Sequence, residues 1–440
     1  MEFKEMYLAD CVSDIIDYRG KTPKKLKDNW NEDGEYRAIS AKNIKNMNLV
    51  NQDSMNKAKA DLYKKWMKKE IDKGDILLTS EAPLGETLYW DLDEKIILSQ
   101  RVFGLKANNE IVNSKYLFAY MQTPFFKHEL FARESGTTVT GIRRKELEKV
   151  IIKVPSMHIQ NYIGQMIYNI NYKINNNNNI IANLEELSQT LFKRWFVDFE
   201  FPNKDGNPYK SSGGEMIKSE LGEIPKNWRE TTLGDYVDLD KGLSYKGKFL
   251  DKKREIEESI PMLSLSNFHF YSGFKNEKTK YYFGDFKDKH KVRAGDIIIA
   301  ATDLTQDRKM LGSPALVPDL NVNMIYSLDV FKVKNSILPK YVLYFLLQSK
   351  KYREFIEGSA TGTTVLRVSK DIILKVPIII DLNIANKFNE MVKKYMYKIE
   401  GLSKENEVLV ELRETLLPKL MSGEIAIPDD IEVNTDEFSI

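Results

Sequence analysis

Residues whose types and spacing could support catalysis are sparse in this sequence. The segment Asn207–Tyr209 reads "NPY", but the loop of an adenine methyltransferase needs a second proline, and this tripeptide lies in a polar linker. Residues 242–249 read "GLSYKGKF" and resemble a phosphate-binding loop. The last position is Phe249, however, which has no hydroxyl to bind magnesium, and no helical pattern follows it. Both segments therefore favour ordinary turns over catalytic sites.

The remaining candidates for chemistry also favour structural roles. The acids Asp14 and Asp17 suit surface or capping positions better than an acid/base pair. The single cysteine, Cys11, excludes a disulfide framework, and the four histidines are not spaced as zinc ligands. No glycine-rich dinucleotide motif or nucleophile constellation is visible. We therefore expect a chain that is not an enzyme and that binds no metal or cofactor itself.

The composition is typical of a globular protein with more than one core. The chain has 440 residues, of which 42% are hydrophobic, and this length suits two or more domains. The first residues lack an apolar signal core, and the sequence has no run of about 18 apolar residues. We expect a soluble cytoplasmic protein without a membrane partner.

Charge is distributed unevenly, although the net charge is only +2. Residues 1–155 carry 27 Lys and Arg against 24 Asp and Glu, and residues 226–378 carry 26 against 19. The segments that follow each of them, 156–225 and 379–440, are acidic. A mild basic bias is also common on a solvated surface, so charge alone does not decide whether the chain binds nucleic acid.

The sequence repeats itself once over its whole length. The stretch "SGTTVTGIRRKELEKVIIKVP" at 135–155 returns as "GTTVLRVSKDIILKVP" at 362–377. Six further pairs keep the same order: LADCVSDI and LGDYVDLD, AISAKNI and MLSLSNF, KGDILLTS and AGDIIIAA, SQRVFGLK and YSLDVFKVK, SKYLFAYMQ and PKYVLYFLLQ, LEELSQTLFKRWF and LVELRETLLPKLM. A period of roughly 225 residues is far too long for a solenoid and indicates a duplicated unit.

Each copy predicts a lobe of short strands and turns that a long helix follows. β-Branched runs bounded by Gly and Asp, such as Ile76–Thr79 and Ile297–Ala300, are typical of strands. Lys115–Gln122 and Lys340–Gln348 are predicted to form short helices. A proline then ends each lobe.

After each lobe, apolar residues recur at alternating spacings of four and three, the pattern of a coiled-coil seam. The first seam runs from Ile163 to Trp195 and the second from Phe388 to Leu420. A loop between two shorter helices is an alternative at Asn175–Asn179, because Asn is a poor helix former. The seam keeps its phase through this run, which favours one continuous helix.

These patterns predict an α+β protein with two similar mixed α/β lobes, separated by two long antiparallel coiled-coil helices and related by a pseudo-two-fold axis. The predicted parts are a first lobe at 1–155, a central helix at 156–200, a linker at 201–225, a second lobe at 226–378, a C-terminal helix at 379–425 and a tail at 426–440. The linker is rich in Gly, Pro, Ser and Asn, and it can carry the chain from the end of the first long helix to the second lobe. Two similar but non-identical basic lobes on a rigid spacer suit the reading of two unlike DNA half-sites.

The full pattern resembles the DNA-specificity subunit of type I restriction–modification systems. The lobe boundaries carry the resemblance: Gly136-Thr137-Thr138-Val139 leads to Pro155, and Gly362-Thr363-Thr364-Val365 leads to Pro377. The linker "GNPYKSSGGEM" and the ending "LLPKLMSGEI" are also similar to that family. The family often continues the lobe-ending proline as "PPLxEQ", of which this chain keeps only Gln160 in the first copy and nothing in the second. This departure concerns the helix starts and not the architecture.

The resemblance implies that each lobe is a target recognition domain for one half of a split, asymmetric site on double-stranded DNA. It also implies that the helices set the spacing of the half-sites and bind two methyltransferase (modification) subunits, which motor–nuclease (restriction) subunits join. S-adenosylmethionine, ATP and magnesium would belong to those partners. The alternative is a non-catalytic two-lobed DNA-binding scaffold of another defence or partition system.

The candidate DNA contacts are polar and basic residues in equivalent turns, because base edges need polar partners and phosphates need Lys and Arg. In the first lobe they are Arg19, Lys21, Lys24, Lys42, Asn43, Ser80, Glu81, Arg101, Thr138, Arg143 and Arg144. In the second they are Lys241, Ser244, Lys246, Ser266, Asn267, Thr302, Asp303, Gln306, Arg308, Lys309, Thr364 and Arg367. The loops "TSEAPLGE" and "ATDLTQDRKMLG" occupy equivalent positions but share almost no sequence, so we predict that they read bases.

Overall fold

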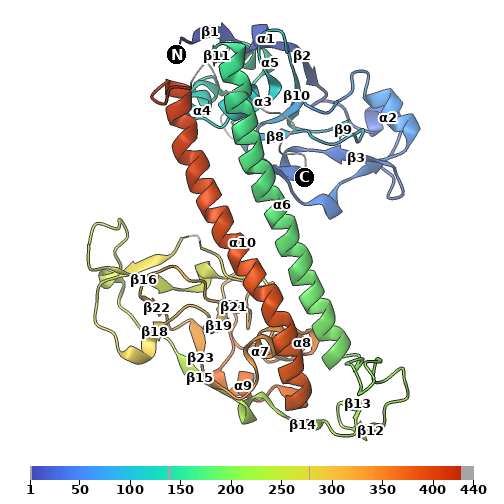
Figure 1. Ribbon diagram of the computed structural model, residues 1–440, viewed down its shortest axis with the longest axis vertical. Helices are drawn as coiled ribbons and strands as arrows, with labels where there is room; N and C mark the ends of the chain where they lie inside the picture. Colours follow the sequence, from blue (N-terminus) through green and yellow to red (C-terminus); the bar gives the residue numbers. More distant parts are fainter. Residues whose placement is uncertain (1, 137–139, 277, 428–440) are drawn as a thin grey trace. The chain divides into compact units, whose positions relative to one another are not determined.

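The computed structural model describes residues 2–136, 140–276 and 278–427 (Figure 1). The chain divides into two compact units. Unit 1 comprises Met1–Asn179 and Ser403–Ile440, and unit 2 comprises Ile180–Leu402. Each unit holds one lobe of strands and short helices together with one half of each long helix. The mixture of helices and strands confirms the predicted α+β class.

The largest sheet of unit 1 has four antiparallel strands in the order β2-β10-β7-β8. These are β2 (Val12–Asp17), β10 (Val102–Ala107), β7 (Ile76–Ser80) and β8 (Leu84–Tyr89). Strand β7 is buried along its whole length because both faces are covered. Ile76 and Leu78 belong to one hydrophobic cluster and Leu77 to another, as the two-residue period of a strand requires.

A second sheet of unit 1 has the order β6-β3-β9, in which β3 and β9 are parallel. The remaining strands form the pairs β4·β5 and β1·β11. Their bounds are β1 (Lys4–Tyr7), β3 (Tyr36–Ile39), β4 (Ile44–Lys45), β5 (Asn48–Leu49), β6 (Lys57–Ala58), β9 (Ile97–Leu98) and β11 (Ile151–Val154). Because β3 and β9 are parallel, the segments that follow them leave the sheet at the same edge.

Short helices cover the strands of unit 1. They are α1 (Leu8–Cys11), α2 (Ala60–Trp66), α3 (Ser114–Tyr120), α4 (Pro124–Phe131) and α5 (Arg144–Leu147), with 3₁₀ turns η1 (Lys24–Leu26), η2 (Ala41–Asn43) and η3 (Gln52–Ser54). Helix α3 begins where the Asn113 side chain accepts hydrogen bonds from the backbone N–H groups of Lys115 and Tyr116. Helix α4 begins with Pro124 after the cap Thr123. The short helix predicted at Lys115–Gln122 is therefore confirmed.

Unit 2 repeats the same plan. A four-stranded sheet has the order β15-β23-β19-β21, and a second has the order β17-β16-β22-β18 with β16 and β22 parallel. Two further pairs are β14·β25 and β20·β24. Their bounds are β14 (Arg229–Thr232), β15 (Val237–Lys241), β16 (Ile260–Leu263), β17 (Lys280–Tyr282), β18 (Lys291–Val292), β19 (Ile297–Ala300), β20 (Thr302–Asp303), β21 (Pro314–Leu316), β22 (Met324–Tyr326), β23 (Val330–Ser336), β24 (Leu366–Arg367) and β25 (Pro377–Ile380).

The short helices of unit 2 follow in the order of α3, α4 and α5 of unit 1. They are α7 (Lys340–Leu346), α8 (Lys350–Gly358) and α9 (Lys370–Leu374), with 3₁₀ turns η4 (Leu233–Asp235), η5 (Gly247–Phe249), η6 (Leu265–Asn267) and η7 (Asp288–His290). Helix α7 confirms the short helix predicted at Lys340–Gln348. The internal repeat of the sequence is thus a repeat of one fold.

The two long helices are α6 (Met157–Phe196) and α10 (Leu382–Ser422). Helix α6 passes through Asn175–Asn179 without a break, so the prediction of one continuous helix is confirmed. All twenty seam positions predicted from the sequence are buried or half-buried. The apolar seam, rather than the helix propensity of Asn, therefore decides the local structure.

Within unit 1 the two helices run antiparallel. Asn171 of α6 accepts a hydrogen bond from Arg413 at 2.8 Å, and Asn177, further along α6, donates one to Asn406 at 3.0 Å. The start of α6 is fixed to the lobe by Gln160, whose amide donates to the carbonyls of Pro155 and Ile111. The one residue of the family pattern kept at this point is thus a buried anchor of the helix.

The segment predicted as the linker, 201–225, contains regular structure. The segment contains the hairpin of β12 (Met216–Ser219) and β13 (Gly222–Pro225). Phe201 stacks on Tyr209 and on Trp228, with ring centroids 4.6 and 5.2 Å apart. Aromatic burial orders this segment in spite of its turn-rich composition.

The ranges described contain no helix that combines the length and apolar character needed to span a membrane.

Candidate nucleic-acid interface

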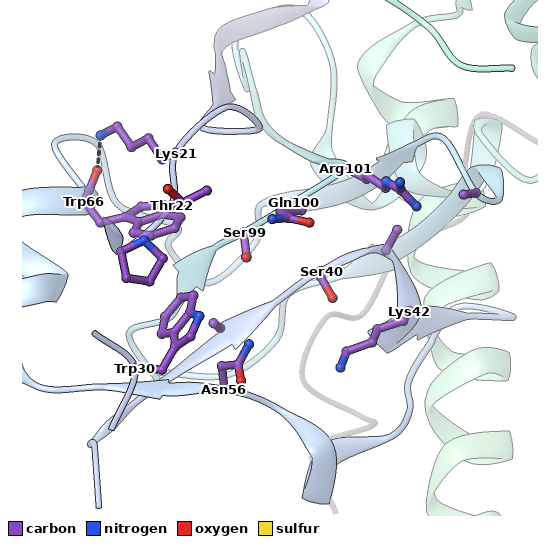
Figure 2. A pocket seen from close by; sticks show the side chains of 14 residues that line it. Lys21, Thr22, Trp30, Ser40, Lys42, Asn56, Trp66, Ser99, Gln100 and Arg101 are labelled. Atoms are coloured by element: carbon purple, nitrogen blue, oxygen red, sulfur yellow. Dashed lines mark hydrogen bonds between the residues drawn. The ribbon is translucent and has the colours of Figure 1, made fainter. Parts of the chain in front are cut away.

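A hollow of about 310 Å³ lies in unit 1 where the parallel strands β3 and β9 end (Figure 2). Ile39 is paired with Leu98, so the segments Ser40–Lys42 and Ser99–Arg101 leave the sheet next to each other. The hollow is lined by Lys21, Thr22, Pro23, Trp30, Ala38, Ser40, Ala41, Lys42, Asn56, Trp66, Ala82, Ser99, Gln100 and Arg101. The fold thus brings the predicted residues Lys21, Lys42 and Arg101 to one place from three separate turns.

One side of the hollow is aromatic and firmly held. Trp66 is buried, and its indole N–H donates to the Leu98 carbonyl at 3.0 Å. The ring of Trp30 lies 5.4 Å from that of Trp66, centroid to centroid. Lys21 donates to the Trp66 carbonyl, as the dashed line in Figure 2 marks. These contacts give the hollow a rigid wall.

The rest of the rim carries cationic and amide groups that reach solvent. Lys42, Gln100 and Arg101 are exposed. Burial lowers the pKa of Lys21, and the nearby charge of Lys68 lowers it further, as expected where cations gather. Lys and Arg side chains bind phosphates or guanine edges, and Gln and Asn amides match adenine edges. The arrangement can therefore hold a nucleic-acid backbone and contact bases.

Glu81 and Arg101 join two of the predicted loops. Their carboxylate and guanidinium groups lie 3.0 Å apart, and both side chains remain partly exposed. Glu81 also forms a β-bridge with Gly141, so the loop after β7 lies beside the residues that follow the GTTV sequence. Arg101 has a left-handed backbone, with φ of 64°.

Arg19 has a structural role in this arrangement. Its guanidinium donates to both carboxylate oxygens of Asp17 at 2.8 Å and to the Ile142 carbonyl at 3.1 Å, and it covers the Phe103 ring at 3.9 Å. Burial alone would raise the pKa of Asp17, but the hydrogen bonds from Arg19 outweigh it and hold the pKa below its usual range. Arg19 therefore connects Asp17 of β2 with Phe103 of β10 and with the segment at Ile142.

The other candidates in unit 1 lie outside the hollow. Lys24 is exposed in η1, and Arg143 and Arg144 are exposed at the start of α5. Arg144 pairs with Glu148 at 2.8 Å. Thr138 lies outside the described residues.

In unit 2 the predicted reader loop lies against the second GTTV turn. Strand β20 pairs with β24, so that Thr302 lies opposite Arg367. Gln306 donates to the Thr363 carbonyl at 2.9 Å, and Arg308 donates to the Glu357 carbonyl at 2.7 Å. The two side chains predicted to read bases are thus exposed but also tie the loop to the lobe.

The remaining candidates in unit 2 lie on its surface. Lys241, Ser244, Lys246, Thr364 and Arg367 are exposed. Ser266 is half-buried and donates to the Lys278 carbonyl, and Lys309 is half-buried and lies 3.2 Å from Asp307. Ser266 stands at the position equivalent to Lys42 in the repeat, so the two units present different groups there.

Five candidates are corrected by their burial. Asn43, Asn267, Ser80, Thr302 and Asp303 each expose 5% or less of their surface, so none can reach a base edge or a phosphate as the side chain now lies. Asn43 and Asn267 accept the backbone N–H of Ser40 and Ser264, which completes the cap of η2 and η6. The sequence could not separate these caps from surface amides, because "SAKN" and "SLSN" look like polar turns.

Sequence reasoning missed Trp30, Asn56, Ser99 and Gln100 of the hollow. Ser99 and Gln100 directly precede the predicted Arg101, so the end of a short buried strand was an available signal for them. Trp30 and Asn56 reach the site only through tertiary folding. No local pattern marks them.

No group of three or more His, Cys, Asp or Glu side chains placed to hold a metal ion occurs in the described ranges.

Comparison with known proteins adds three findings. Residues 9–186 match the type I restriction modification DNA specificity domain. The chain is 26% identical, over 93% of its length and 91% of the relative, to the type I restriction enzyme MjaIX specificity subunit of Methanocaldococcus jannaschii. It is 26% identical, over 81% of its length and 88% of the relative, to the HindI specificity subunit of Haemophilus influenzae.

A solved structure has the same fold. The S subunit of a type I restriction–modification system from M. genitalium aligns with a TM-score of 0.61 and 15% identity, over 96% of both chains. The lobe boundaries, the duplicated fold and these matches agree. Residues 9–186 therefore carry a type I restriction modification DNA specificity domain, and the chain is similar over most of its length to specificity subunits of type I restriction enzymes.

Proposed function

We propose that this chain is the non-catalytic subunit that directs a methyltransferase to a bipartite, asymmetric DNA sequence, with unit 1 reading one half and unit 2 the other. The proposal rests on the observation that the two units share one arrangement of strands but carry different side chains at the equivalent edge of a sheet. After β9, Ser99 is followed by Gln100 and Arg101, whereas after β22, Ser327 is followed by Leu328 and Asp329. Two similar arrangements of strands with different side chains at this edge suit two unlike half-sites.

Direct readout in unit 1 is assigned to the hollow. Arg101 and Gln100 are exposed beside the fixed wall of Trp30 and Trp66, and Lys42 lies across from them in Figure 2. The exposed Arg143 and Arg144 suit phosphate contacts, which fix register without carrying sequence information. The loss of a base contact would therefore change specificity, and the loss of a phosphate contact would weaken binding to all sequences.

The long helices are assigned to spacing and assembly. Helix α10 carries Val408 and Leu412, which are 65% and 43% exposed although both are aliphatic. Two methyltransferase subunits would dock on such helix surfaces, and motor–nuclease subunits would complete the restriction enzyme. S-adenosylmethionine, ATP and magnesium are proposed to bind to those partners and not to this chain.

The test is a genome-wide map of methylated adenines in cells that carry this chain with its methyltransferase partner, compared with cells from which this chain is deleted. The proposal predicts one split motif with two unlike halves and a fixed gap, present only with the chain. Reintroducing the chain should restore the same motif. An unchanged map after deletion would reduce the chain to a scaffold without a role in target reading.

A further inference from the structure

The loop that follows β19 in unit 2, residues 301–312, is held in one shape by its own polar groups. The carboxylate of Asp303 is buried and accepts hydrogen bonds from the Thr305 N–H at 2.7 Å, the Thr305 hydroxyl at 2.8 Å and the Met310 N–H at 2.8 Å. One side chain thus closes the loop onto itself.

The longer side chains of the same loop fix it to the rest of unit 2. Gln306 donates to the Thr363 carbonyl and Arg308 to the Glu357 carbonyl. Strand β20, at the start of the loop, pairs with β24. The loop's polar side chains therefore serve mainly to hold its shape.

Leu304 projects from this fixed loop. Its side chain is 70% exposed, although it lies between buried Asp303 and a bonded Thr305, and it belongs to none of the hydrophobic clusters of the described residues. Single exposed aliphatic residues are common on protein surfaces. This one, however, directly follows β20 in a loop that its own hydrogen bonds hold, and the exposed cations Arg308 and Arg367 lie in the same loop and in the paired strand β24.

We propose that Leu304 is a specificity-determining residue that packs against the 5-methyl group of a thymine in the half-site read by unit 2. The thymine methyl is the apolar group that a base pair presents in the major groove, and it discriminates A·T from the other pairs there. The inference rests on the proposed function, because it assumes that unit 2 reads DNA. It goes further by assigning an apolar contact where a polar one was expected.

Unit 1 should lack this contact. Its equivalent loop carries Glu81, Ala82 and Pro83 before the half-buried Leu84, and Glu81 is paired with Arg101. No large exposed aliphatic side chain lies among Glu81, Ala82 and Pro83 of this loop. The apolar reader is therefore a feature of one half-site only.

The experiment uses deoxyuridine, which lacks only the methyl group of thymidine. After the methylated motif has been mapped, each thymine of the unit 2 half-site is replaced by deoxyuridine in turn, and binding of the complex with its methyltransferase is measured. We expect one position at which the wild-type complex loses affinity about three- to fivefold, as the removal of one buried methyl predicts. At that position Leu304→Ala should bind thymine and deoxyuridine equally well.

The control is Ile337→Ala, because Ile337 is 64% exposed in the same unit but lies in the turn after β23. This variant should keep the full preference for thymine. If Leu304→Ala retains the wild-type loss at every deoxyuridine, or if the unit 2 half-site contains G·C pairs only, the inference is wrong. The proposed function fails separately, since in that case the wild-type chain would direct no split motif at all.

Discussion

At the scale of single residues, neighbouring polar side chains in η2 have opposite roles. Asn43 is fully buried and bonds to Ser40 and to the carbonyls of Val50 and Asn51. Lys42 is exposed at the rim of the hollow. Substitutions at these two neighbouring residues can therefore distinguish an effect on stability from an effect on DNA binding.

We predict that Asn43→Ala destabilises unit 1 by about 1–3 kcal/mol, because it leaves buried backbone groups without their partner. The recognised sequence should not change. Lys42→Ala should leave the unfolding midpoint unaltered and lower DNA affinity, reducing the salt dependence by about one counterion. Urea denaturation and binding titrations at several salt concentrations measure both effects. A changed methylated motif in Asn43→Ala would restore this residue as a reader.

The site could be predicted from sequence only where a residue's exposure follows from its local pattern. Arg101 and Lys42 stand next to short buried strands, and both proved exposed at the hollow. Asn43 and Asn267 looked the same in sequence but are caps, since capping depends on a backbone turn that polar composition does not reveal. Trp30 reaches the hollow from a loop with no recurring pattern.

At the scale of elements, the seam of α6 and α10 contains a polar pair. Asn177 donates to Asn406 at 3.0 Å and to Glu405 at 2.8 Å, and its own carbonyl oxygen is buried without a partner. Replacing Asn177 alone removes a donor from Glu405 and from the Asn406 side-chain oxygen, although Asn406 keeps its own hydrogen bond to Asn178 at 2.9 Å. Replacing both Asn177 and Asn406 with apolar residues removes the polar contact from the seam.

We predict that Asn177→Leu alone does not stabilise unit 1 and that Asn177→Leu with Asn406→Leu is at least as stable as the wild type. A double-mutant cycle in urea measures the coupling. Asn176→Leu is the control, because Asn176 is exposed on the same helix and reports only the higher helix propensity of Leu. If the losses of unfolding free energy in the two single variants simply add in the double variant, the proposed pairing of Asn177 and Asn406 is wrong.

The lobe of unit 1 approaches α6 closely at Gly164. A Cβ atom at this position would lie 2.6 Å from the backbone nitrogen of Tyr116 in α3. Gly401 in α10, by contrast, has no atom within 4 Å of such a Cβ. Substituting Gly164 therefore changes both packing against α3 and helix propensity, whereas substituting Gly401 changes helix propensity alone.

We predict that Gly164→Ala destabilises the protein by about 1–3 kcal/mol through overpacking, although Ala favours helix. Gly401→Ala should stabilise it by up to about 1 kcal/mol, because it gains propensity without a clash. Thermal unfolding of both variants decides the matter. Equal stabilisation by the two substitutions would mean that α3 does not pack on Gly164.

The elements themselves were largely predictable, because their signals are periodic. The seam kept its phase through Asn175–Asn179, and α6 is continuous there. The linker was not predictable from its composition, since the burial of Phe201 and Tyr209 against Trp228 orders it through contacts distant in sequence.

At the scale of the whole molecule, one fold occurs twice and carries different groups at equivalent edges. The duplicated order of sheets, with parallel β3·β9 in unit 1 and β16·β22 in unit 2, explains the internal repeat of the sequence. Under the proposed function, duplication with divergence would let each unit change its half-site without altering that of the other. The central claim is therefore that the two units read separate half-sites.

The most direct test is a methylation map of the variant Gln100→Ala with Arg101→Ala, made beside that of the wild-type chain in the same cells. Both residues are exposed at the hollow of unit 1. We predict that one half of the motif becomes relaxed at one or two positions, because good base contacts contribute about 1–3 kcal/mol of discrimination each. The other half and the gap should stay as they are. A change in both halves together, or a map identical to that of the wild type, would contradict the assignment of separate readers.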